Sequence, residues 1–303
     1  MQFDDGWSSW RTQVAPLLAR YGGRATGFVN NQHMRSGRIT ADDLRALQND
    51  FRWEIGSHAY HHLNAVRFVQ QRGLEAWKAE ELVAALGELR GAGLRVSDFV
   101  FPFNAYTPEL ASAVLAAGLG SYRRADAFAL AAGRREDGSL PGTSIDLTRY
   151  VPAAVLRRWV DLARAQGSVL FLYGHQVLPD EAFTVGRVAS VSPRELVADA
   201  DIVWPAGDDV VLVPDMGRRS LAVPAGELRF EGGRRIRSPE GGADLTRLTS
   251  PGAFFLIGPS YGTRLSDFKD LVEYASSRLT FYTVTEIVAG KHAVSAEGVA
   301  GAP

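Results

Sequence analysis

The chain has 303 residues, of which 46% are hydrophobic and 22% are charged, as expected for a globular protein with one barrel or two small domains. Its formal net charge of −1 argues against a general role in binding nucleic acid or a membrane surface, because such proteins usually carry a basic excess. The absence of cysteine excludes disulfides, thiolate metal sites and a cysteine nucleophile.

No uninterrupted apolar run approaches the roughly 20 residues that a membrane span needs, and no secretory signal is visible. Residues 3–7 are instead expected to belong to the folded domain. The sequence therefore leaves open whether the natural chain extends upstream of Met1, and it does not determine the localisation.

Strands and helices are expected to alternate through the first 174 residues. A short strand ends at Phe3, and Thr40 with Asp43 predicts a capping box at the start of one helix. Alternation at this spacing predicts parallel βαβ units, and hence an α/β sheet or barrel. The other expected strands are 25–29, 52–56, 98–103 and 168–174, and the expected helices are 10–20, 40–47, 74–91, 107–118 and 153–165.

The pattern changes after His175. Short strands separated by glycine, proline and acidic turns predict β structure over 202–237. The α/β pattern is expected to resume with a strand at 254–258, a helix at 266–277 and a strand at 279–284. We therefore predict a main barrel part, a β-rich insertion, a C-terminal barrel part and a disordered tail, with the boundaries 1–178, 179–250, 251–291 and 292–303.

The sequence FDDG places two carboxylates, Asp4 and Asp5, at the end of the first strand, directly before a glycine that permits a sharp turn. Two adjacent acids make each other harder to ionise unless positive charge is near. Taken alone, the pair is equally compatible with a surface turn at a helix start.

Three of the six histidines lie in the stretch IGSHAYHH, which follows an expected strand. His58 and His62 are four residues apart, so one helical turn would put both imidazoles on the same face, a suitable spacing for a divalent metal. His61 would lie on the other side of that turn. The alternative is a solvated histidine-rich loop without a ligand.

Two imidazoles and one carboxylate form a common catalytic zinc site that leaves one position for water. Either Asp4 or Asp5 could supply the carboxylate, and the other could act as a base toward the bound water. His175 ends the apolar strand 168–174 and could serve as a general acid, although a lone histidine there is usually structural.

The motifs FDDG, SHAYHH, FVFPFNAY and LYGH, in this order, resemble the polysaccharide deacetylase family with NodB homology, also called carbohydrate esterase family 4. The resemblance implies an α/β fold, a distorted (β/α) barrel, that removes N- or O-acetyl groups from carbohydrate polymers with a metal-bound water. It also implies the site residues. Asp4 would be the base, His175 the acid and the Phe103 backbone N–H an oxyanion donor, and the metal ligands would be Asp5, His58 and His62.

One divalent ion is expected, with zinc favoured by the ligand types and cobalt or nickel as alternatives. The chain departs from the family pattern at Val100, where an arginine often contacts the catalytic aspartate. Arg123 or Arg149 could replace that arginine. Asp146 is our candidate for the family's fourth motif, which supports the catalytic histidine.

The expected partner is an acetylated glycan, with no nucleic acid and no membrane span, and the resemblance favours an extracellular, periplasmic or cell-envelope location. Two alternatives remain open at this point. The same scaffold could hydrolyse a small amide or cyclic imide, or it could be a non-catalytic carbohydrate-binding relative.

Overall fold

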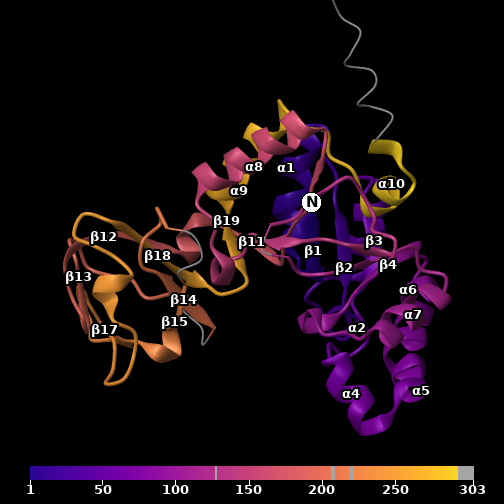
Figure 1. Cartoon of the computed structure of the whole chain (residues 1–303), viewed down its shortest axis with the longest axis horizontal. Helices are drawn as coiled ribbons and strands as arrows, with labels where there is room; N and C mark the ends of the chain where they lie inside the picture. Colours follow the sequence, from indigo (N-terminus) through magenta and orange to yellow (C-terminus); the bar gives the residue numbers. More distant parts are fainter. Residues whose placement is uncertain (127, 206–208, 219–221, 293–303) are drawn as a thin grey trace, which may run out of the picture. The chain divides into compact units, whose positions relative to one another are not determined.

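The computed structural model describes residues 1–126, 128–205, 209–218 and 222–292 (Figure 1). Its contacts divide the chain into two compact units, which are described separately below. Unit 1 contains residues 1–143, 159–175 and the chain from 272 onward, and unit 2 contains residues 144–158 and 176–271. The expected disordered tail, 292–303, lies outside the described residues except for His292.

An eight-stranded sheet forms the centre of unit 1, in the order β7-β5-β4-β3-β2-β1-β10-β8. All neighbouring pairs from β7 through β10 are parallel, as connections through helices require. This open parallel sheet confirms the α/β class and the distorted (β/α) barrel. The strands are β1 Gln2–Asp5, β2 Thr26–Val29, β3 Glu54–Ser57, β4 Val96–Val100, β5 Tyr122–Arg123, β7 Ser139–Leu140, β8 Thr143–Ser144 and β10 Leu172–Gly174, and a separate antiparallel pair joins β6 Leu130–Ala131 to β9 Val169–Leu170.

The helices expected at 10–20, 40–47, 74–91 and 107–118 are present in unit 1, and the capping box at Thr40 and Asp43 is confirmed. The helices α2 and α4 were not predicted. Two of the expected helices contain a π-helical stretch, labelled η1 and η2, where the backbone is widened by one residue per turn. No helix in the described part of the chain is long and apolar enough to cross a membrane. The elements are η1 Trp10–Val14, α1 Ala15–Arg20, α2 Asn31–Arg35, α3 Ala41–Asn49, α4 Ala65–Arg72, α5 Leu74–Trp77, η2 Lys78–Val83, α6 Ala84–Gly91, η3 Pro102–Asn104, α7 Pro108–Ala116 and α10 Val284–Val288.

Trp10, the first residue of η1, is fully buried against β2 because Gly27 has no side chain. A Cβ atom at Gly27 would lie 2.6 Å from the Trp10 ring, so only glycine permits this close packing. The indole Nε1 of Trp10 donates a hydrogen bond to the backbone oxygen of His175 at 2.7 Å. The buried Trp10 side chain therefore links the hydrophobic core to the backbone at the end of β10.

The strand expected at 279–284 is wrong, because residues 279–283 form no strand and α10 begins at Val284. Thr283 caps this helix in a capping box with Glu286, and the Val284 N–H donates to Thr26 Oγ1 at 2.9 Å. Side-chain oxygens thus take the N–H groups that a strand would have paired in a sheet.

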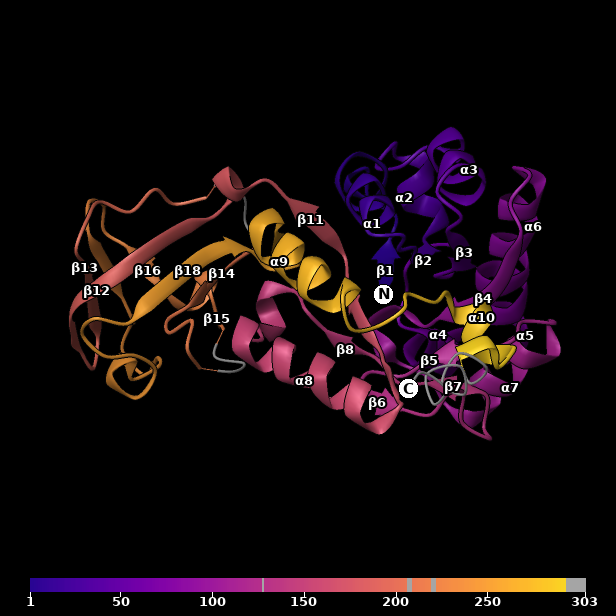
Figure 2. The same cartoon turned by 90° about the horizontal axis from the view of Figure 1, so that it is seen from above.

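Unit 2 contains a seven-stranded antiparallel sheet in the order β15-β14-β18-β12-β13-β17-β16 (Figures 1 and 2). The β structure predicted over 202–237 is confirmed, and β12 and β13 precede it in the same sheet. The strands are β11 Gln176–Leu178, β12 Thr184–Ser192, β13 Glu195–Ala198, β14 Val210–Val213, β15 Val223–Pro224, β16 Arg229–Phe230, β17 Arg235–Arg237, β18 Phe254–Pro259 and β19 Gly262–Arg264, and β11 pairs with β19 in parallel.

The expectation that the strand at 254–258 resumes the α/β pattern is wrong. This strand, β18, lies between β12 and β14 and is antiparallel to both. Its residues from Phe255 to Gly258 are buried, and an apolar run buried on both faces has the same pattern in either kind of sheet. The helices α8 Ala153–Gln166 and α9 Leu265–Ser276 match the expected segments, and each contributes residues to both units.

Two buried carboxyl groups lie next to α10 in unit 1. Glu54 Oε2 accepts the N–H of Thr285 at 2.8 Å, and Asp98 Oδ1 accepts the hydroxyl of Ser121 at 2.5 Å. Burial and the neighbouring Glu54 raise the pKa of Asp98 well above its usual range. Burial alone would also raise the pKa of Glu54, but its hydrogen-bond donors, Asp98 first among them, lower it. The opposite directions of the two pKa shifts favour one proton shared by the pair and held by Asp98.

This shared proton predicts a pH dependence of stability. Because the pKa of Asp98 is raised in the folded state, its contribution is complete below the unfolded pKa of about 3.9 and is lost as the pH rises through the folded pKa. We expect Asp98→Asn, which keeps the neutral shape, to remove that part of the pH dependence. Urea unfolding of both proteins over a pH series measures it, and equal pH slopes would contradict the assignment.

Candidate active site

The predicted site residues come from the carboxyl ends of neighbouring parallel strands. Asp4 and Asp5 end β1, His58 directly follows β3, and His175 directly follows β10. Phe103 follows β4, which is the next strand after β3 in the sheet. Because carboxyl ends of parallel strands meet at one edge of a sheet, residues distant in sequence are brought together there.

Three of these side chains converge on one point. The Nε2 atoms of His58 and His62 lie 3.4 and 3.1 Å from Asp5 Oδ1. One ligand atom from each residue lies within 4.8 Å of the other two. Asp5 and His58 are buried, and His62 is half-buried, so the point is shielded from water on the side of the sheet.

The protonation of His58 follows from its second partner. Its Nδ1 lies 2.7 Å from the backbone oxygen of Val100, which can only accept, so Nδ1 carries the hydrogen. In the neutral ring Nε2 then presents a lone pair to Asp5 Oδ1, which is buried. Two lone pairs facing each other require a cation or a proton between them, and two imidazoles with one carboxylate suit a divalent cation.

Burial alone would raise the pKa of Asp5, but the imidazoles of His58 and His62 lower it far below its usual range. Asp5 is therefore ionised. An ionised oxygen beside two ring nitrogens is the donor set that the sequence predicts for a metal, and these three residues could hold one.

Asp4 has a different partner from its neighbour. Arg123, the last residue of β5, donates Nη1 to Asp4 Oδ1 at 2.8 Å and Nη2 to Oδ2. The side chains of Arg123 and Asp4 are 1% and 3% exposed, so the ion pair is almost fully desolvated. Burial would raise the pKa of Asp4, but the guanidinium lowers it below its usual range. Of the two arginines considered in place of the family's arginine, Arg123 is the one that pairs with Asp4.

His175 reaches the same group of side chains. Its Nε2 lies 4.0 Å from Asp5 Oδ2, and its side chain is mostly buried. The hydrogen bond from Trp10 to the His175 backbone, described above, holds this strand end. The fourth-motif candidate Asp146 belongs to unit 2, where its Oδ2 accepts the Ser144 hydroxyl at 2.7 Å.

Left-handed backbone is concentrated at this site. Among the described residues, six other than glycine have positive φ angles, and five of them lie in the site loops. Such residues cost on the order of 1–3 kcal/mol each, so the surrounding structure must hold them in place. Phe103, with φ 59°, exposes 63% of its surface, and its ring centre lies 4.8 Å from that of His62. The five residues are Asp5, Ala59, His62, Phe103 and Asn104.

Sequence reasoning missed His33, which follows β2 at the same edge of the sheet. Its ring stacks on His62 with centres 5.8 Å apart, and its Nδ1 donates to the Asp5 backbone oxygen at 3.2 Å. The available signal was its place just after a predicted strand, in NNQHM. Sequence reasoning also missed Glu81, which contacts His61 and is considered below.

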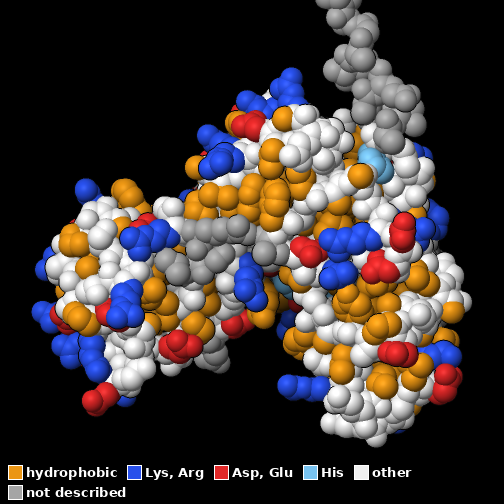
Figure 3. All heavy atoms as spheres, viewed as in Figure 1, with side chains coloured by type: hydrophobic (Ala, Val, Ile, Leu, Met, Phe, Trp, Pro, Cys, Tyr) orange, Lys and Arg blue, Asp and Glu red, His pale blue; other side chains and the backbone are white. Residues whose placement is uncertain are grey.

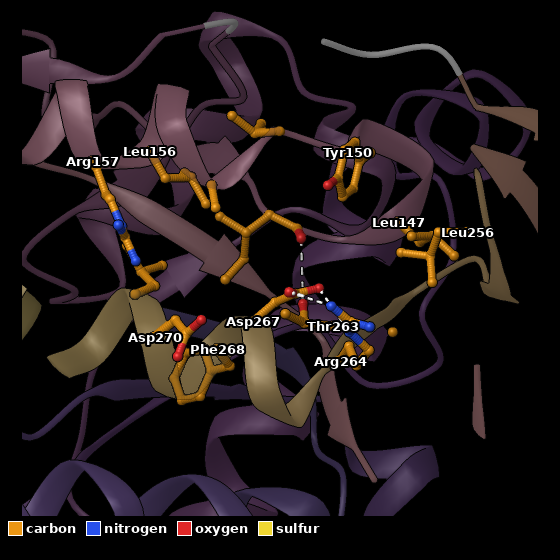
Figure 4. A pocket seen from close by; sticks show the side chains of 15 residues that line it. Leu147, Tyr150, Leu156, Arg157, Leu256, Thr263, Arg264, Asp267, Phe268 and Asp270 are labelled. Atoms are coloured by element: carbon orange, nitrogen blue, oxygen red, sulfur yellow. Dashed lines mark hydrogen bonds and ion pairs between the residues drawn. The ribbon is translucent and has the colours of Figure 1, made fainter. Parts of the chain in front are cut away.

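A second concave region lies in unit 2, lined by residues of α8, α9 and the strands β18 and β19. Hydrophobic side chains gather over α8 and α9 on the face in view in Figure 3. Inside the pocket, Arg264 and Asp267 form an ion pair at 2.7 Å, and burial raises the pKa of Tyr150 to about 12 (Figure 4). None of its lining residues is a histidine, whereas the group formed by Asp5, His58 and His62 belongs to unit 1.

The ligand geometry predicts the effect of removing one imidazole. His58→Ala should lose the bound cation, because two ligand atoms remain where three converged. The matched control is His292→Ala, whose ring contacts the backbone oxygen of Ala132 rather than Asp5 and which should keep the cation. Metal content after dialysis measures both, and full occupancy in His58→Ala would show that the ligands are elsewhere.

Comparison with known proteins finds one matching family model and several similar solved structures. Residues 1–121 match the family model described as polysaccharide deacetylase. The chain is similar to a solved family 4 carbohydrate esterase from Streptomyces lividans in complex with acetate, with 20% identity, a TM-score of 0.41 and coverage of 57% of this chain and 76% of that one. It is also similar to the Streptococcus pyogenes deacetylase PplD in complex with acetate, with 13% identity, a TM-score of 0.36 and coverage of 41% and 54%.

A third similar structure is the Xyl-CE4 domain of a multidomain xylanase from the hindgut metagenome of Trinervitermes trinervoides, with 20% identity, a TM-score of 0.38 and coverage of 58% and 71%. These TM-scores are low, and the fold therefore rests on the strand pairing of this chain. No curated protein matches the chain. The expected resemblance is confirmed over residues 1–121, which match the polysaccharide deacetylase model and contain the first three motifs, whereas LYGH lies outside the matched residues.

Proposed function

We propose that the protein is a metal-dependent polysaccharide deacetylase, which hydrolyses N-acetyl or O-acetyl groups of a carbohydrate polymer. The observation that carries the proposal is the convergence of Asp5, His58 and His62 beside the ion pair of Asp4 with Arg123. The family match of residues 1–121 supports the same reaction class.

When bound by Asp5, His58 and His62, a divalent cation would supply Lewis acidity for the acetyl carbonyl and lower the pKa of the attacking water. The ligand types favour zinc, with cobalt and nickel as alternatives. The other steps are assigned to side chains and backbone of this chain.

Asp4 is the proposed general base. It is ionised, and its two hydrogen bonds from Arg123 fix the orientation of its carboxylate. Asp4 takes one proton as the water oxygen bonds to the acetyl carbon, and the backbone N–H of Phe103 donates to the carbonyl oxygen as negative charge develops there.

His175 is the proposed general acid. As the bond from the acetyl carbon to the sugar nitrogen or oxygen breaks, His175 gives a proton to that leaving atom. The products are acetate and a free amine or hydroxyl on the sugar. The His175 side chain is mostly buried, and its Nε2 atom lies 4.0 Å from Asp5 Oδ2.

The exposure of the site supports a polymer rather than a small imide as the substrate. The Phe103 side chain next to His62 is largely exposed, and Leu63 is partly exposed. A closed pocket would be expected for a small cyclic imide, whereas an exposed aromatic ring can lie against a sugar ring. All five residues that the chemistry requires are present, which argues against a non-catalytic relative.

The direct test measures acetate released from a panel of acetylated glycans, with and without a chelator. We expect release that the chelator abolishes and added zinc restores. A small cyclic imide and a small acetyl ester are assayed in parallel. Hydrolysis of the imide with no acetate released from any glycan would replace the proposal with the small-amide alternative.

Replacing each of the two adjacent aspartates by asparagine should have different effects on cation affinity and on activity. Asp5→Asn removes a charged ligand, so cation affinity should fall together with activity. Asp4→Asn should keep the cation and lose roughly 10²–10⁴-fold in rate, because the proton acceptor is gone. Metal content and acetate release are measured for both variants, with thermal unfolding as a control because Arg123 loses its partner in Asp4→Asn.

The opposite pattern would reverse the two roles. An Asp4→Asn protein without cation, beside an inactive Asp5→Asn protein that keeps its cation, would make Asp4 the ligand and Asp5 the base.

A further inference from the structure

Glu81 is a fully buried carboxylate outside the set of residues that the proposed reaction uses. It lies in the π-helical stretch η2, Lys78–Val83, and its side chain is 0% exposed. A buried carboxylate is costly unless hydrogen-bond donors surround it. Its donors therefore indicate what the residue does.

Among the described residues, the donors that contact Glu81 come from the loop between His58 and His62. The backbone N–H groups of Tyr60 and His61 donate to Glu81 Oε2 at 3.1 and 2.9 Å. The Nδ1 atom of His61 lies 2.7 Å from Glu81 Oε1, and because a carboxylate accepts, this nitrogen carries the hydrogen. One side chain thus engages two successive residues of the loop through three hydrogen bonds.

The carbonyl groups of the same loop are held from the other side. Asn30 Nδ2 lies 3.4 Å from the backbone oxygens of both His58 and Ala59, and the N–H of Gln32 donates to the Tyr60 oxygen at 3.0 Å. Ala59 and His62 have φ angles of 61° and 57°, a conformation that needs support from its surroundings. Glu81 supplies acceptors on one side of the loop, and α2 with its preceding residue supplies donors on the other.

We infer that Glu81 is a positioning residue, which holds the loop so that the Nε2 atoms of His58 and His62 both face Asp5. The inference rests on the proposed cation site. The third histidine, His61, therefore has its own role: its ring bonds to Glu81 rather than to Asp5. Glu81 lies in the middle of the continuous helix that runs from α5 through η2 to α6, in the stretch where the backbone is π-helical.

Two substitutions separate the hydrogen bonds of Glu81 from its charge. Glu81→Gln can still accept both backbone N–H groups through its oxygen and can donate its amide N–H to the other tautomer of His61. Glu81→Leu fills a similar volume but leaves both N–H groups buried without an acceptor. Positioning by hydrogen bonds predicts that Gln keeps the cation affinity and Leu loses it, whereas an effect of charge alone predicts equal losses.

The test titrates zinc into the cation-free full chain in competition with a chelating dye. We expect Glu81→Leu to bind about 10–100-fold more weakly than wild type, as is typical when a group that orients a ligand is removed, and Glu81→Gln to rescue most of that loss. The matched control is Glu286→Leu, because Glu286 also accepts a backbone N–H, that of Thr283 at 2.9 Å, and pairs with Arg24. This control should lower stability and leave zinc affinity unchanged.

A second readout needs neither cation nor activity. Amide hydrogen exchange of the cation-free protein should show protected N–H groups at Tyr60 and His61, and Glu81→Gln should retain this protection. Free exchange of these two amides in the wild type, or wild-type zinc affinity in a folded Glu81→Leu protein, would overturn the inference. Failure of the proposed function would give a different result, because the wild type itself would then bind no zinc or release no acetate. Amide exchange at Tyr60 and His61 would still test whether Glu81 holds the loop.

Discussion

The contact on which the site depends is the approach of one carboxylate oxygen to two imidazole nitrogens. Asp5 Oδ1 lies between His58 and His62, and the hydrogen bond from His58 to Val100 places the hydrogen of a neutral His58 ring on the nitrogen that faces away from Asp5. In a buried place such a contact is unfavourable without positive charge between the atoms. The surrounding structure holds these three groups close together, in an arrangement that suits a cation.

Adjacent residues acquire different chemistry from different strands. Asp4 and Asp5 follow each other in β1, and successive side chains of a strand point to opposite sides. Asp4 therefore meets Arg123 from β5, and Asp5 meets the histidines that follow β3. Both pKa values are lowered, one by a guanidinium and the other by imidazoles, so two ionised acids coexist side by side. The proposed division between proton acceptor and ligand rests on these partners.

Support for the site comes from residues in widened helices. Trp10 in η1 donates to the backbone of His175, and Glu81 in η2 accepts from the backbone of Tyr60 and His61. In both cases a large or charged side chain is buried completely and bonds to the main chain of a loop at a strand end. Hydrogen bonds to the main chain fix a loop without competing for the groups that act in catalysis. A precise arrangement of ligands on irregular backbone is thereby maintained.

The sequence by itself determined the main alternation of strands and helices in the first 174 residues and the choice of Asp4, Asp5, His58, His62 and His175 as candidates, because hydrophobic periodicity and motif spacing are local properties. Tertiary structure alone decided which arginine meets Asp4, since Arg123 ends a strand of only two residues. It also decided the place of β18, whose buried run suits either sheet, and the absence of a strand before α10. His33 and Glu81 joined the site for the same physical reason: their roles come from partners distant in sequence, and such contacts exist only once parallel strands have aligned their ends.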